Sequence, residues 1–118
     1  MEEAVSWVVE LSVRPGQLET LRSLMEELAA SARDEPGTLV YDWYISGDGG
    51  TVHVYERYAD SEATIAHNRA FGERFAGRFL EAVEPTRFTV YGDPSPAARE
   101  ILDGFGATYL GAWGGFSR

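Results

Sequence analysis

The chain contains no cysteine and no lysine, and only two histidines, His53 and His67, among its 118 residues. Without cysteine there is no disulfide, no thiolate nucleophile and no cysteine-ligated zinc or iron–sulfur cluster. Without lysine there is neither Schiff-base chemistry nor a P-loop lysine to bind phosphate. Two histidines leave little for a histidine-rich metal site, and the carboxylates show no spacing that suggests one. We therefore expect no bound metal.

Positive charge is also scarce. Ten arginines face 19 acidic residues, which gives a net charge of −9. A field of that sign repels phosphate backbones and anionic lipid, so we expect neither nucleic acid nor a membrane as partner. No apolar run approaches the roughly 20 residues of a membrane span, and the first residues do not resemble a signal peptide. A soluble cytoplasmic protein is the expectation.

Apolar and aromatic residues, in contrast, are plentiful. Hydrophobic residues make up 44% of the chain and aromatic residues 13%. That content, at this length, is typical of one globular domain with a single core.

The apolar residues alternate with period two in four segments and recur at helical spacing in two others. Alternation predicts half-buried strands, and helical spacing predicts amphipathic helices. In chain order we expect a strand at 4–13, a helix at 17–33, strands at 38–46 and 51–59, a helix from 62 to about 83 and a strand at 87–91. This β-α-β-β-α-β order is typical of ferredoxin-like α+β domains, which are sandwiches of one sheet and two helices.

The second helix has two expected irregularities. We expect a break near Asn68 and an end at Glu84-Pro85, because proline cannot continue a helix. Its buried stripe is expected to be Phe71, Phe75, Phe79, Leu80 and Val83.

The last part of the chain differs in character from the rest. We expect residues 1–92 to form the ferredoxin-like domain and residues 93–118 to form a C-terminal extension, because so much glycine cannot support a second core. Ser95-Pro96 favours a helix start and Asp103-Gly104 a helix end. The aromatic residues of the extension are expected to pack on the barrel or a partner subunit, or alternatively to cap a pocket: Phe105, Tyr109, Trp113 and Phe116.

Both faces of the predicted sheet carry apolar or aromatic side chains. On the strand at 51–59, one face has Val54, Glu56 and Tyr58, whereas the other has His53 and Tyr55. Helices can cover only one face, so a monomer would expose the other at a cost in solubility. We therefore expect a homodimer through the bare sheet face, with His53 on that face.

Three motifs resemble the antibiotic biosynthesis monooxygenase (ABM) family. They are Glu35-Pro36-Gly37 followed by Tyr41, the strand 52–58, and the segment 59–63 followed by His67. The resemblance covers about residues 4 to 92. It implies a dimeric α/β barrel in which two sheets pack face to face and each subunit keeps a pocket between its sheet and its helices.

The resemblance also implies an activity. The characterised oxygenases of the family convert quinols or hydroxyarenes to quinones with dioxygen, without metal or flavin. We accordingly expect a cofactor-independent monooxygenase that takes a small aromatic or quinone-like molecule. Relatives that degrade haem use an asparagine and a haem-ligating histidine where this chain has Val9 and about Gly77.

Two residues are the expected catalytic groups. His67 is the candidate general base, because histidine titrates near neutral pH. It precedes Phe71 by one helical turn and Phe75 by two, and these rings would line an apolar pocket. Tyr58 stands where the family's hydroxyarene oxygenases have a pocket tryptophan, and it could orient the substrate. Where those enzymes have an asparagine and a tyrosine, this chain has Val54 and Thr64.

Glu56 lies on the helix-facing side of its strand, where a lone carboxylate is costly. We expect it to pair with Arg74 or Arg78 rather than to act as a second acid/base group. The expected substrate pocket is Tyr41, Trp43, Val54, Glu56, Phe71 and Phe75, with Trp7 in the ordinary core.

Two alternatives stay open at this point. One is a non-catalytic dimer of the same fold that binds a small molecule or acts as a scaffold. The other is a different small-molecule enzyme on this barrel, such as an isomerase or a lyase.

Overall fold

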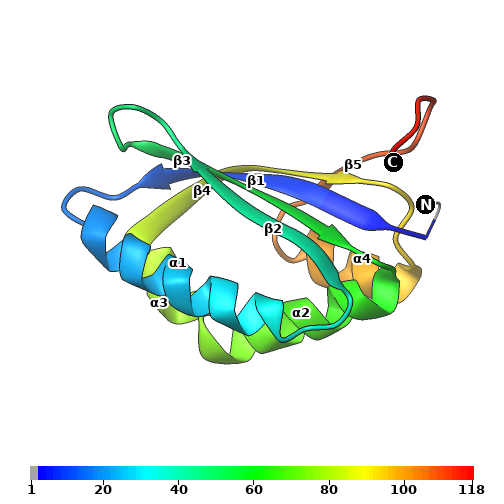
Figure 1. The fold of residues 1–118 in the computed structure, drawn as a ribbon, viewed down its shortest axis with the longest axis horizontal. Coiled ribbons are helices and arrows are strands. Elements are labelled where there is room, and N and C mark those ends of the chain that lie inside the picture. The colour runs from blue at the N-terminus through cyan, green and yellow to red at the C-terminus, as the bar shows by residue number, and fades with distance from the viewer. Residues whose placement is uncertain (1–2) are drawn as a thin grey trace.

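The computed structural model describes residues 3–118 and is built on one mixed sheet (Figure 1). The elements are β1 Val5–Val13, α1 Leu18–Arg33, β2 Thr38–Ile45, β3 Thr51–Tyr58, α2 Ser61–Arg74, α3 Ala76–Ala82, β4 Val83–Tyr91, α4 Pro96–Asp103 and β5 Thr108–Leu110. The strand order is β2-β3-β1-β4-β5. Strands β1 to β4 pair antiparallel, and β5 pairs parallel to β4. The predicted ferredoxin-like α+β fold is confirmed.

The helices gather on one side of the sheet, and the core lies between the two layers (Figure 1). Helix α1 places Leu21, Leu24 and Leu28 toward the sheet at helical spacing, each no more than 3% exposed. Strand β3 buries alternate residues, as its period of two predicts. The end of the sheet near the start of β1 holds a second buried cluster, which includes Val5, Trp7, Tyr58, Val90 and Leu102.

The second helix breaks at Phe75, not near Asn68 as predicted. The Asn68 side chain donates to the carbonyl of Thr64 at 2.8 Å, which keeps it inside a regular helix. At Phe75 the backbone leaves the helix, with φ of −126°, and this residue ends α2 and precedes α3. The change of direction places Phe75 in the core with α1, whereas Leu80 is 50% exposed rather than buried.

The helix ends at Ala82, within one residue of its predicted end at about Val83, but the strand that follows starts four residues before the predicted position 87. Strand β4 begins directly at Val83, so Glu84 and Pro85 lie in the sheet rather than in a connection. The pairing of β1 with β4 shifts register between Glu10 and Leu11, opposite this segment. Such an irregularity accommodates a proline, which has no N–H to donate to the ladder.

The C-terminal segment joins the same core as far as β5. The Ser95 side chain accepts the N–H of Ala98 at 3.2 Å, which caps α4, and Leu102 is fully buried. Beyond β5 the chain is exposed. Trp113 is 102% exposed and Phe116 82%, so neither packs against the sheet or the helices.

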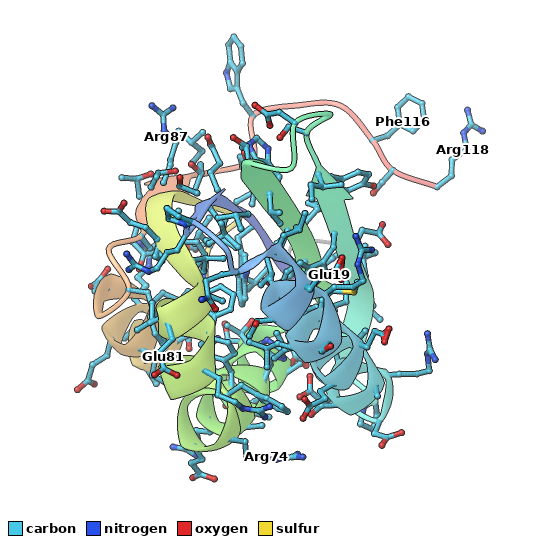
Figure 2. All side chains as sticks on the ribbon, turned by 90° about the vertical axis from the view of Figure 1, so that its left-hand side faces the viewer. Glu19, Arg74, Glu81, Arg87, Phe116 and Arg118 are labelled. Atoms are coloured by element: carbon cyan, nitrogen blue, oxygen red, sulfur yellow. The ribbon has the colours of Figure 1, made fainter. Side chains whose placement is uncertain are left out.

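The other face of the sheet has no helix over it. Cross-strand register places Val8, Val40, Tyr44, Tyr55 and Tyr91 on this outer face. The C-terminal tail, with Phe116 and Arg118 near its end, extends beyond the sheet on the side away from the helices (Figure 2). Within residues 3–118, no helix has the length and apolar character needed to cross a membrane.

Candidate functional site

A cavity of about 130 Å³ lies between the sheet and the helices. Its walls are almost entirely apolar and aromatic, and four strands, α2, α3 and the segment after α4 contribute to them. Of the predicted pocket residues, the lining includes Tyr41, Trp43, Val54, Glu56 and Phe71, together with His67. Phe105, which was expected to pack on the barrel or a partner or alternatively to cap a pocket, does line the cavity, and so does Trp7, which was expected in the ordinary core. The remaining lining residues were not predicted as pocket residues: Val9, Asn68, Ala76, Phe79, Leu80, Pro85 and Phe88.

Two expected site residues lie outside the lining. Phe75 is turned away by the helix break and packs against α1, with the guanidinium groups of Arg74 and Arg78 over its ring at 5.0 and 5.6 Å. Tyr58 is fully buried behind Glu56 and stacks on Trp7, with 4.7 Å between ring centroids. Tyr58 therefore has no surface to offer a ligand.

The polar end of the cavity is a cluster of hydrogen-bonded and ion-paired groups around His67. The Nδ1 atom of His67 lies 2.8 Å from Oε1 of Glu35, and its Nε2 atom lies 3.3 Å from Oε1 of Glu56. The Tyr58 hydroxyl donates to the same Glu56 oxygen at 2.5 Å. The His67 and Glu56 residues are only 7% and 6% exposed, so water screens these contacts little.

Glu56 therefore pairs with His67 and Tyr58, not with an arginine as predicted. Arg78 instead forms a bidentate pair with Glu27 on the solvent side of α3, at 2.9 and 3.1 Å. Arg74 covers the outer side of the Phe75 ring. The break between α2 and α3 directs both arginines away from the sheet.

Glu35 is a site residue that sequence reasoning missed. It follows α1 in the Glu35-Pro36-Gly37 motif, which is close to α2 because Gly37 has no side chain. A β-carbon on Gly37 would lie 2.4 Å from that of Ala63. The Thr38 hydroxyl donates to Glu35 Oε1 at 2.7 Å and helps to fix the carboxylate. The motif was visible in the sequence, but its contact with His67, 32 residues away, was not.

Burial and charge act in opposite directions on these groups. Burial alone would lower the pKa of His67, but hydrogen bonds to Glu35 and Glu56 outweigh it and raise this pKa from 6.5 to about 9. Burial alone would raise the pKa of Glu35, yet the bonds from His67 and Thr38 lower it. Burial and then the Glu56 charge raise the pKa values of Tyr41 and Tyr58, so both phenols stay protonated.

Trp43 carries an unusual polar atom in the cavity wall. Its indole Nε1 is the one buried side-chain nitrogen or oxygen, among residues 3–118, with no hydrogen-bond partner. The indole N–H lies near the Tyr41 hydroxyl, where it opposes the rise in the pKa of Tyr41. The two groups do not, however, meet in the geometry of a hydrogen bond. A buried donor left unpaired costs about 1–3 kcal/mol, which a ligand oxygen could recover.

The arrangement does not resemble a metal centre. Within residues 3–118, no group of three or more histidine, aspartate or glutamate side chains is placed to hold a metal ion. Both ring nitrogens of His67 face carboxylate oxygens, which leaves no lone pair directed at the cavity.

Residues 4–84 match the family model of the antibiotic biosynthesis monooxygenases. The chain belongs to this family. The match ends at the start of β4, so Phe88 and Phe105 of the cavity wall lie beyond it.

Individual ABM relatives agree with this assignment. Rv0793 of Mycobacterium tuberculosis, a provisionally assigned monooxygenase, is 33% identical over 67 residues. Those residues are 57% of this chain and 66% of the relative, just under two thirds of its length. The solved structure of Rv0793 gives a TM-score of 0.62 at 27% identity, over 80% of this chain and 98% of that chain.

Two further solved structures share the fold. MupZ from Pseudomonas fluorescens has a TM-score of 0.82 at 18% identity, over 98% of this chain and 95% of that one. SnoaB from Streptomyces nogalater, a cofactor-independent oxygenase, has a TM-score of 0.67 at 15% identity, over 79% and 95%. The MupZ match thus includes the C-terminal segment that the ABM family model leaves out.

The two departures from the ABM oxygenase pattern can now be located. Val54 does line the cavity, where it adds apolar wall. Thr64 does not, because its hydroxyl donates to the backbone carbonyl of Asp60 inside α2, at 3.0 Å. The polar chemistry of this ABM protein is concentrated instead on His67 and its two carboxylates.

Proposed function

We propose that the protein binds a small, flat, hydroxylated aromatic molecule, a quinol or hydroxyarene, in this cavity and oxidises it with dioxygen. The observation that carries the proposal is an aromatic cavity closed at one end by the Glu56–His67 pair. Apolar walls hold a planar ring and exclude water, while the polar end accepts the proton of its hydroxyl.

The donors and acceptors of the cavity fit two oxygens on one ligand. The Glu56 carboxylate can accept a hydrogen bond from a phenolic hydroxyl. The unpaired indole N–H of Trp43 can donate to a second oxygen, and the neutral phenol of Tyr41 stands beside it. A quinol or a hydroxylated ketone has this pairing of donor and acceptor.

For this reaction the protein needs only to bind the ligand and to accept a proton from it. A hydroxyarene and dioxygen give a quinone and water: one oxygen atom enters the ring, and the other leaves with the hydrogens lost from the ring carbon and the hydroxyl. The electrons come from the ligand, whose ionised form is the better donor. The shared fold with the cofactor-independent oxygenase SnoaB supports this proposal.

Oxygen uptake is the direct test. A panel of quinols and hydroxynaphthalenes would be mixed with wild-type protein, His67→Ala and His53→Ala. His53 is the matched control, because it lies on the outer face of the sheet, outside the cavity lining, with its Nε2 atom 3.7 Å from a different glutamate, Glu10. We expect the His67 variant alone to lose uptake. Uptake no faster than in buffer, or unchanged in His67→Ala, would rule the proposal out.

A second function is favoured by the convergence of Glu35, His67 and Glu56. Such a cluster suits proton transfer without dioxygen, as in an isomerase or a lyase. Turnover of a candidate ligand under nitrogen would favour this alternative. Tight binding with no turnover in air or nitrogen would instead favour a non-catalytic binding protein.

We further propose that the protein works as a homodimer whose subunits meet through the outer sheet face. That face presents Tyr44, Tyr55 and Tyr91, and Tyr44 is 59% exposed. The tail beyond β5 carries two exposed aromatics, Trp113 and Phe116, which we assign to the partner subunit. Sedimentation should give a dimer at micromolar concentration, and deleting residues 111–118 should weaken it. A monomeric wild-type protein would exclude this assembly.

A further inference from the structure

We propose that Glu56, rather than His67, takes up the proton of the ligand's hydroxyl, and that His67 is a fixed cation that positions it. The inference rests on the proposed binding of a hydroxylated ligand. It does not depend on the reaction with dioxygen.

The geometry around His67 leaves it no site for another proton. Each ring nitrogen faces an oxygen that can only accept: Glu35 Oε1 at 2.8 Å and Glu56 Oε1 at 3.3 Å. A ring nitrogen that faces an ionised carboxylate carries a hydrogen, so both nitrogens are protonated and the ring is an imidazolium. The raised pKa of His67, about 9, agrees with this protonation state at neutral pH.

The groups packed around the ring come from three strands and from the segment after α1. The two carboxylates are Glu35, after α1, and Glu56, on β3. The three aromatic rings are Trp7 on β1, Tyr41 on β2 and Tyr58 on β3, whose centroids lie 5.0 to 6.4 Å from that of the imidazole. Two of these groups are anionic and three are neutral. One cation between two anions leaves the polar end with a net charge of −1.

Glu56 has one oxygen available for a ligand. Its Oε1 atom holds the Tyr58 hydroxyl at 2.5 Å and faces His67. Its Oε2 atom takes part in none of the hydrogen bonds found among the described residues, and Glu56 lines the cavity. This second oxygen is therefore the acceptor that a ligand hydroxyl meets.

The proton step then balances without any change at His67. The O–H bond of the ligand breaks, its proton binds Glu56 Oε2, and Glu56 becomes a neutral acid. The ligand becomes a phenolate, so the net charge of ligand and cluster stays at −1. The new carboxylic acid and the Trp43 N–H can both donate to the oxygens of the anion.

A binding experiment separates Glu56 from a merely structural role. The probes are 1-naphthol, its methyl ether and 1-naphthoate, measured by calorimetry. We expect naphthol to bind wild-type protein about tenfold more tightly than the ether, because the ether has no hydroxyl hydrogen to donate to the charged Glu56 carboxylate. The naphthoate anion should bind worst, because the cluster repels it.

The variants decide the assignment. Glu56→Gln keeps the shape and can still accept the Tyr58 hydroxyl, but it should abolish the preference for naphthol over the ether. Glu26→Gln is the matched control, since Glu26 is exposed on α1, and it should keep the preference. An unchanged preference in Glu56→Gln would overturn the proposal.

The protonation state of His67 is read separately by nitrogen NMR, with His53→Gln to assign the two imidazoles. We expect both His67 nitrogens to carry protons at pH 7, and Glu35→Gln to lower the pH at which the ring titrates. A neutral His67 at pH 7 would overturn the proposal even if dioxygen is consumed. If naphthol binds as expected without oxygen uptake, only the proposed oxidation fails. If naphthol does not bind at all, both fall.

Discussion

The stability of the protein should fall between pH 6.5 and 9 because of one buried side chain. His67 has a folded-state pKa of about 9, against 6.5 when unfolded. Below pH 6.5 both states hold the proton, and the stabilisation is complete. As the pH rises, the unfolded state releases the proton first, so the free energy of unfolding decreases until the folded state also releases it.

The size of the effect follows from those two values. At roughly 1.4 kcal/mol per pH unit, the interval from 6.5 to about 9 corresponds to about 3 kcal/mol. This is a large share of the roughly 5–15 kcal/mol that stabilises a typical domain. Above about pH 10 the tyrosines add a second decrease. The unfolded protein then releases the phenol protons of Tyr41 and Tyr58, whereas the folded protein keeps them because burial and the Glu56 charge raise both pKa values.

Urea unfolding at fixed protein concentration measures this slope, because subunit association would otherwise shift the midpoint. His67→Gln should be less stable at pH 7 and should lose most of the decrease between pH 7 and 9. His53→Gln should keep the wild-type slope, since it removes the other imidazole and leaves the contacts of His67 with Glu35 and Glu56 in place. A wild-type protein with flat stability over this range, or a His67→Gln protein with an undiminished slope, would refute the electrostatic reasoning.

Three substitutions test other parts of the site. Gly37→Ala should destabilise the protein by about 1–3 kcal/mol in thermal or urea unfolding, because the new β-carbon would overlap that of Ala63 in α2. Gly72→Ala is the control and should not destabilise it, because a β-carbon at this position of α2 meets open space. Tyr58→Phe should cost about 1–3 kcal/mol through the lost bond to Glu56, and equal stability would mean that this bond contributes nothing. Phe105→Ala should weaken ligand binding severalfold with little change in unfolding, because the ring is 48% exposed at the cavity wall; unchanged binding would exclude it from the site.

Much of the fold was predictable because it depends on local patterns. The alternation in β1 and β3 and the helical spacing of α1 reflect which side of each element is buried, and the structure confirms these elements. The helix break was misplaced because Asn68 is satisfied within its own helix by Thr64. The break depends instead on the packing of Phe75 against α1, which is a long-range contact.

The candidate site, like the fold, has one part that local sequence patterns predict and another that depends on long-range contacts. The sequence alone identified His67 and Glu56 as buried polar residues facing the helix–sheet layer, since periodicity determines which face of a strand or helix a residue occupies. Only the tertiary structure brought Glu35 to His67, because 32 residues separate them and the contact depends on the missing side chain at Gly37. That contact converts the histidine from a candidate base into a buried cation, which no local pattern could reveal.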